Sequence, residues 1–292
     1  MLQSSKGEKK TMLKTLRAKG LSSTELKEIA LALMLLDHIH YFFVFTGAVP
    51  EWFSMLGRVS APLFLFCTVE GFAHTRDRKT YLLRLWALGA GMGVIQFLIG
   101  LGLGKRADGF YPMNGILRDL TVACLLWQGI DWLRQRRFGR ALALIGGVGV
   151  LWPAVSLALM SVLPPVGQLP VYFLSWTVLP SWTFSTDGGI AFILGGVLLY
   201  ALRERRLAQA LVWAAWALFT DLGSVLWLLQ DGWGLGRLLL TCYQWMEVFA
   251  VPLMLLYNGQ RGAGHKKLFY WFYPVHVYVL YALSCAVMAF GG

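Results

Sequence analysis

The chain has 292 residues, of which 57% are hydrophobic and only 14% are charged, and its mean hydropathy is +0.59. A soluble domain carries about 25% charged residues, so the composition excludes an ordinary soluble protein. Long unbroken apolar runs, such as 141–163 and 207–229, also exclude a β-barrel, whose strands would be short and alternating. The sequence therefore predicts an all-α, polytopic membrane protein.

The net charge of +11 is explained by topology, without a nucleic-acid partner. Most basic residues lie before the first apolar run or in alternate connections between runs, at 74–84, 132–140, 203–206 and 258–267. This positive-inside distribution predicts a cytoplasmic N-terminus and a multi-pass protein of the plasma or inner membrane. The four cysteines lie inside apolar runs without metal-ligand spacing, so we expect neither a disulfide nor a metal site.

Residues 1–24 are too basic and too weakly apolar for a cleaved signal peptide, and we expect a cytoplasmic segment there. A single integral membrane domain, 25–292, is expected to follow, as a bundle of about nine or ten transmembrane helices. Prolines interrupt 164–188, and its apolar part is too short to cross, so a re-entrant or interfacial piece is expected. The expected spans are 25–47, 52–73, 81–103, 113–132, 139–163, 187–202, 207–229, 236–257 and 268–290.

The first span carries ionisable side chains near its middle. Asp37, His40 and Tyr41 share one helix face, and His38 lies beside that face. A charged side chain at this depth costs a few kcal/mol or more, and is therefore rare unless it faces a cavity and has a function. The first span thus contributes a candidate functional cluster.

Other spans also carry polar side chains, and their depths suggest two layers. At 1.5 Å of rise per residue, His38, Glu247 and His276 lie about 12 to 16 Å from the cytoplasmic end, in a layer suited to proton transfer. Arg58 and two further residues, Arg118 and Asp221, lie at about 21 Å. A purely structural interpretation is also possible. Arg58 would then form an ion pair with Asp37 or Asp221 that fixes the register of two helices, and the residues of the inner layer would be packed polar side chains without a catalytic role.

Two patterns in the first span resemble known families. Lys27-Glu28-Ile29-Ala30, with His38 eleven residues after the lysine, resembles the first helix of the large membrane acyltransferase superfamily that includes acyltransferase-3 and heparan-α-glucosaminide N-acetyltransferase. Met34-Leu35-Leu36-Asp37-His38-Ile39 is more closely similar to the TraX family, named for the conjugative pilus pilin acetylase. Stretches that also fit this family are 58–64, 70–72, Asn114, 256–262 and 272–276. His40 departs from the family pattern, where glycine is common, and 140–230 offers little to align.

The resemblance implies transfer of an acetyl group from cytosolic acetyl-CoA to an amine or hydroxyl of an acceptor protein or glycan in or across the membrane. His38 would take a proton from the attacking group, with Asp37 or Glu247 orienting it or stabilising its charged form. The developing negative charge on the thioester carbonyl needs a hydrogen-bond donor, for which the candidates are Asn114, Arg58 and His276.

Because CoA carries phosphates, a basic cytoplasmic mouth is expected as well. The residues predicted there follow the second span or belong to the C-terminal signature, and topology alone would also make these connections basic. They are Arg76, Arg78, Lys79, Asn258, Arg261 and Lys266.

Two functions of other classes remain open at this point. A proton-coupled transporter would use the same buried groups as a relay, and a non-catalytic membrane assembly subunit would use them to hold helices together. Membrane lipid is an expected partner in every case. The acceptor, N- versus O-acetylation and the oligomeric state are not predicted by the sequence.

Overall fold

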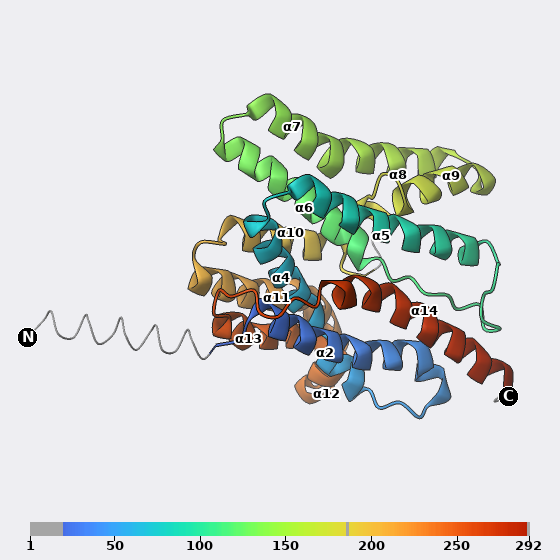
Figure 1. Cartoon of the computed structure of the whole chain (residues 1–292). Coiled ribbons are helices and arrows are strands. Elements are labelled where there is room, and N and C mark those ends of the chain that lie inside the picture. The colour runs from blue at the N-terminus through green and yellow to red at the C-terminus, as the bar shows by residue number, and fades with distance from the viewer. Residues whose placement is uncertain (1–19, 185–186, 291–292) are drawn as a thin grey trace, which may run out of the picture. The chain divides into compact units, whose positions relative to one another are not determined.

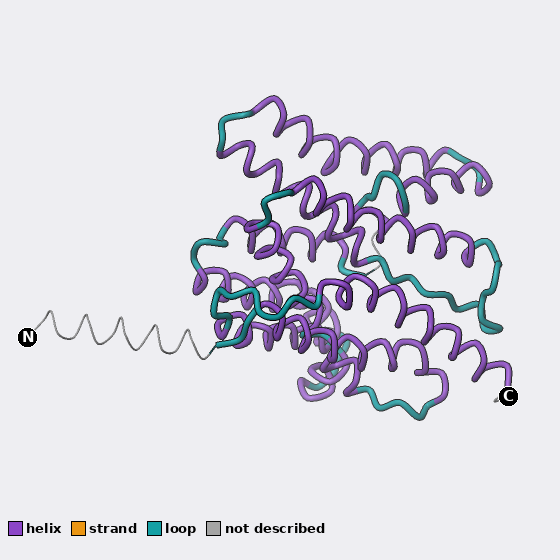
Figure 2. Tube along the Cα trace, in the orientation of Figure 1, coloured by secondary structure: helices purple, strands orange, loops and turns teal. Residues whose placement is uncertain are grey.

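The computed structural model describes residues 20–184 and 187–290, and Figures 1 and 2 show that most of this chain is helical. No strand occurs within these ranges, apart from an isolated parallel bridge between Leu21 and Tyr257. The predicted all-α fold is therefore confirmed. Most of the expected N-terminal segment, 1–19, lies outside the described residues.

The chain forms two compact units, and it passes between them within two helices and at 203–204. Of the described residues, unit 1 comprises 20–67 and 204–269, and unit 2 comprises 68–184, 187–203 and 270–290. The two helices that continue from one unit into the other are α4 (Ser60–His74) and α14 (Lys266–Phe290). The single membrane domain stays a prediction.

In unit 1, α2 (Ser23–Phe43) packs on α3 (Trp52–Gly57), and the short helix η1 (Val44–Thr46) follows α2. The long helix α11 (Arg206–Gln230) packs on three shorter elements that follow it in the chain. These are α12 (Leu235–Thr241), the 3-10 segment η4 (Tyr243–Phe249) and α13 (Ala250–Leu256).

The start of α2 is held by the segment after α13. Ser22 caps the helix in a capping box with Glu25, and the backbone amides of Ser23 and Thr24 donate to carbonyls of residues 260 and 261 at 2.8 and 3.1 Å. Gly262, with φ of +75°, lies so close that an added Cβ would be 2.4 Å from Ser22 Oγ. Glycine is thus required there both by conformation and by space.

In unit 2, α6 (Ile116–Arg134) contacts α5 (Arg78–Gly100), α7 (Phe138–Gly146) and α10 (Gly189–Ala201). The π-helical turn η2 (Gly147–Leu151) joins α7 to α8 (Trp152–Val162), which is followed by α9 (Pro165–Trp176) and η3 (Trp182–Phe184). At 1.5 Å per residue α9 is about 18 Å long, too short to cross a bilayer core of about 30 Å. The segment expected to be re-entrant or interfacial is therefore a short helix that cannot span.

Six helical segments among the described residues are long and apolar enough to cross a membrane. They match six of the expected spans: Ser23–Thr46, Trp52–His74, Arg78–Gly100, Phe138–Val162, Arg206–Gln230 and Leu268–Phe290. A helix also exists at 113–132, but α6 contains four charged residues, and α10 at the expected span 187–202 has only 13 residues. A count of nine crossings and the side of the N-terminus stay predictions.

The expected continuous span 236–257 is broken. Leu235–Thr241 and Tyr243–Leu256 meet at an angle of 73°, with Cys242 at the bend. The 3-10 segment η4 follows the bend, and Pro252 lies in the first turn of α13, where its missing N–H is tolerated. The pair is either a broken span, which would be the seventh, or a re-entrant loop.

Candidate functional site

A polar cluster joins α2 to α3 in unit 1. Asp37 Oδ1 accepts from Ser54 Oγ at 2.7 Å and forms an ion pair with Arg58 Nη2 at 2.6 Å. Arg58 Nη2 also donates to Ser54 Oγ at 3.0 Å. The helices approach closely at Gly57, where an added Cβ would lie 2.3 Å from Asp37 Cβ. Of the two carboxylates that the sequence left open, Asp37 is therefore the ion-pair partner of Arg58.

Arg58 extends this cluster to the broken helix of unit 1. Its Nη1 donates to Gln244 Oε1 at 3.4 Å, and Gln244 Nε2 in turn donates to Glu247 Oε1. Asp221 on α11 lies near enough to interact electrostatically with Glu247, and its Oδ2 is buried without a hydrogen-bond partner in the described chain. The 3-10 turn η4 thus brings Gln244 within hydrogen-bond distance of Arg58 and Glu247 within electrostatic range of it.

His38 lies on α2 next to this cluster and is buried, with 8% of its surface exposed. Its ring is 6.4 Å from the Tyr41 ring and 6.2 Å from the Phe42 ring, centroid to centroid. His40, on the same helix, is half-buried. Successive residues of a helix point about 100° apart. The bonds of Asp37 to α3 therefore do not imply that its carboxylate orients the His38 ring.

A second polar cluster lies in unit 2 around Arg118. This arginine is 5% exposed, and its Nη1 donates to Gln96 Oε1 at 2.6 Å, while Gln96 Nε2 donates to the backbone carbonyl of Asn114 at 2.5 Å. Arg118 Nη2 is buried and has no hydrogen-bond partner within the part of the chain that the structure describes. A buried guanidinium N–H without an acceptor is costly, which marks Arg118 as a candidate for binding an oxygen atom of a ligand.

Asp187 and His276 lie in the same unit. Asp187 Oδ2 accepts from the backbone amides of Gly115 and Ile116 at 2.5 and 2.7 Å, which caps the start of α6. The His276 ring stacks on Phe272, and its Nδ1 is 2.7 Å from the Phe272 carbonyl. A carbonyl only accepts, so Nδ1 carries the proton and a neutral His276 offers Nε2 as an acceptor. His276 in that form suits proton uptake better than donation to a carbonyl oxygen.

The predicted catalytic residues thus fall into two sets. Unit 1 contains His38, Asp37, Arg58 and Glu247, of which the last three belong to one hydrogen-bonded and electrostatic cluster. Asn114 and His276 belong to unit 2. Their catalytic roles stay predictions.

The residues predicted to bind CoA phosphates have mixed surroundings. Arg78 forms an ion pair with Asp131 at 2.7 Å, and Asp131 also pairs with Arg203 at 3.1 Å. Asn258 donates to the Gly20 carbonyl at 2.8 Å, so it helps to hold the start of α2. Three of the six, namely Arg76, Lys79 and Arg261, are exposed, and the Lys266 side chain lies outside the described residues.

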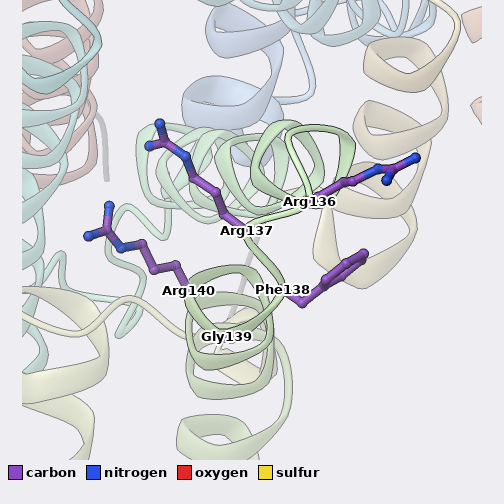
Figure 3. A pocket seen from close by; sticks show the side chains of 5 residues that line it. All are labelled: Arg136, Arg137, Phe138, Gly139 and Arg140. Carbon is purple, nitrogen blue, oxygen red and sulfur yellow. The ribbon is translucent and has the colours of Figure 1, made fainter.

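A basic surface that the sequence analysis used only as a topology signal lies between α6 and α7. We call residues 134–140 the arginine turn, since four of the seven are arginines and all seven are exposed. Residues 136–140 line a shallow depression of about 570 Å³ (Figure 3). The density of arginines in 134–140 was the feature of the sequence that could have indicated this surface. The feature that could have indicated a partner for Arg118 was Gln96, a polar residue within an apolar helix of the same unit.

Comparison with known proteins identifies the family. The TraX protein family matches residues 22–284. The chain is also 27% identical over 276 residues to the probable fimbrial assembly protein FimC, serogroup H1, of Dichelobacter nodosus, covering 92% of this chain and 96% of that protein. No solved structure matches. The match spans both polar clusters and most of the helices, and this helical membrane protein therefore belongs to the TraX protein family.

Proposed function

We propose that this chain is a membrane-embedded acyltransferase that moves an acetyl group from acetyl-CoA to an amine or hydroxyl of an acceptor in or across the membrane. Acceptors compatible with this chemistry are a pilin N-terminus, an amino sugar and a cell-envelope polymer. Membership of the TraX family and similarity to a fimbrial assembly protein favour an acceptor related to pili. The first-helix pattern shared with the membrane acyltransferase superfamily supports the reaction type.

The observation that carries the proposal is the burial of His38 on α2, beside the network of Asp37 and Arg58. In the proposed reaction the neutral imidazole of His38 accepts the proton of the acceptor amine or hydroxyl as its N or O attacks the thioester carbonyl carbon. The C–S bond then breaks, and the CoA sulfur leaves with the proton from the imidazolium. No step requires an oxidant or a metal.

The carbonyl oxygen requires a hydrogen-bond donor as negative charge develops on it. The structure adds Arg118 to the candidates Asn114 and Arg58, because its Nη2 is buried with no acceptor among the described residues. His276, whose Nδ1 is engaged by a backbone carbonyl, is a weaker candidate in its neutral form. Arg58, which belongs to the same unit as His38, already donates to Asp37, Ser54 and Gln244.

The test uses the purified protein in detergent. Binding of acetyl-CoA is measured by calorimetry, and release of CoA is measured by mass spectrometry after addition of a peptide with a free α-amino group or of glucosamine. General-base catalysis contributes about 10²- to 10⁴-fold, so His38→Ala should lose at least a hundredfold in CoA release. His40→Ala is the matched control on the same helix and should retain turnover. Full activity of His38→Ala would remove this histidine from the mechanism.

A second candidate is a non-catalytic role in pilus assembly, favoured by the name of the fimbrial assembly relative. A proton-coupled transporter is a further candidate, favoured by the broken helix that carries Glu247 near Asp221. A folded protein that does not bind acetyl-CoA would support these candidates against the acyltransferase.

A further inference from the structure

The arginine turn places several arginines without an ion pair side by side. Other exposed arginines, such as Arg205 and Arg237, also form no ion pair among the described residues, but in the turn three such arginines line one depression. Elsewhere in the described residues, Arg58, Arg78, Arg106 and Arg203 each form an ion pair with an aspartate. The side chains of residues 136, 137 and 140 form no ion pair within residues 20–184 and 187–290. The fourth arginine of the turn, Arg134, donates to the Ala201 carbonyl at 2.9 Å.

The three unpaired arginines line one shallow depression. Arg137 and Arg140 extend to one side of the turn, and Arg136 and Phe138 extend to the other (Figure 3). All are exposed, and Phe138 has 57% of its surface accessible. Asp131, a carboxylate near this end of α6, is occupied by Arg78, Arg203 and the Tyr200 hydroxyl. The depression is therefore open, strongly basic and without a neutralising carboxylate.

The backbone at Arg136 sets the geometry of the turn. Arg136 has φ of +60°, and it is the one non-glycine residue with a positive φ among the described residues. Glycine adopts this conformation at little cost, whereas a side chain with a Cβ is disfavoured there. The backbone amides of Arg136 and Arg137 donate to the carbonyls of residues 133 and 132 at 2.9 and 2.8 Å, so the positive φ belongs to the C-terminal cap of α6.

We propose that the arginine turn binds phosphate groups at the membrane surface. The guanidinium fork matches the geometry of phosphate oxygens and can bind two of them at once. The candidate span Phe138–Val162 begins within the turn, so the arginines lie at the end of a span, at the level of lipid headgroups. Topology alone explains basic residues near a span, but it does not require three of them around one depression.

The phosphate has two chemically equivalent sources, which the experiment separates. One is the headgroup of an anionic phospholipid, which does not depend on acetyl transfer. The other is the 3′-phosphate of CoA, which rests on the function proposed above. Binding is measured by calorimetry in detergent with a short-chain phosphatidylglycerol against phosphatidylcholine, and with CoA against 3′-dephospho-CoA.

The test variant is Arg136→Gln/Arg137→Gln/Arg140→Gln, which keeps side-chain length and polarity. The control variant is Lys105→Gln/Arg205→Gln/Arg237→Gln, which removes the same charge from exposed positions elsewhere. If the source is lipid, the wild type prefers phosphatidylglycerol, and the test variant binds it about a hundredfold more weakly. If the source is CoA, the preference of the wild type for CoA over 3′-dephospho-CoA disappears in the test variant.

Two results would overturn the proposal. One is a wild-type protein that prefers neither phosphatidylglycerol nor CoA over its comparison ligand. The other is an equal loss of binding in the control variant, which would indicate attraction by total charge alone. If the triple variant does not fold, single Arg137→Gln and Arg140→Gln variants are measured instead, with about a fivefold loss expected for each. This experiment measures ligand binding and not acetyl transfer. A negative result would therefore refute phosphate binding by the arginine turn without refuting acetyl transfer, which the His38 variants test.

Discussion

Replacing Gly57 with alanine should disrupt the polar cluster of unit 1 without removing any of its charged groups. The added Cβ would lie 2.3 Å from Asp37 Cβ and 2.7 Å from Asp37 Cγ. These atoms are close to the α2 backbone and cannot rotate far away, so α3 must move away from α2. That movement would also stretch the bonds from Ser54 and Arg58 to Asp37.

The size of the effect follows from three contributions. Overpacking costs about 1 to 3 kcal/mol, and weakening a hydrogen bond to a charged group costs about 1.5 to 3 kcal/mol. The better helix propensity of alanine returns at most about 1 kcal/mol. We therefore expect the free energy of unfolding to fall by about 2 to 5 kcal/mol, which corresponds to a melting temperature lower by at least about 4 °C.

The assay is thermal unfolding of the purified protein in detergent, with Gly223→Ala as the control. Gly223 lies within α11, and an added Cβ there would have no atom within 4 Å, so this variant should be as stable as the wild type or more stable. If Gly57→Ala and Gly223→Ala melt at the same temperature, the close packing of α2 on α3 at Asp37 is refuted.

Three further substitutions test other parts of the structure. Gly262→Ala should lower the melting temperature by several degrees, because a positive φ and a contact with the cap of α2 both exclude a side chain, and an unchanged value would contradict that contact. Asp131→Asn should destabilise unit 2 by about 3 kcal/mol, because it leaves two arginines without their partner. CoA binding should not improve in this variant. Tighter CoA binding would instead indicate that Arg78, released from Asp131, binds a phosphate of CoA. In the loop after α5, the Arg106 guanidinium lowers the pKa of Asp108 to about 2. The folded-state pKa is below the unfolded value, so this contact stabilises the fold above about pH 4 and the stabilisation is lost as pH falls toward 2. The difference in melting temperature between wild type and Asp108→Asn should therefore be present at pH 7 and shrink at pH 3, and a constant difference would argue against the pairing.

The helices themselves were largely predictable from the sequence. A run of about twenty apolar residues can satisfy its backbone in a bilayer only as a helix, so α2, α5 and α11 fall where their apolar runs lie. The break at Cys242 was not predictable from this rule, because hydropathy averages over a window and does not detect a bend. The 3-10 turn that follows packs against α11, a contact that hydropathy does not report.

The composition of the candidate site was also visible in the sequence, because ionisable residues inside apolar runs are rare. His38, Asp37, Arg58, Glu247 and Arg118 could all be singled out in this way. Their partners could not, because the partner of a side chain depends on the rotation and packing of each helix, which hydrophobic periodicity does not specify.

Tertiary structure decided that Arg58 pairs with Asp37 rather than Asp221 and that Arg78 is bound to Asp131. It also decided that an N–H of Arg118 lacks an acceptor among the described residues, and that three arginines of one turn line a depression. The physical reason is the same in each case. Charge and polarity are local properties of the sequence, whereas an ion pair, an unpaired donor and an open basic surface are defined by which groups from distant segments lie within a few ångströms of one another.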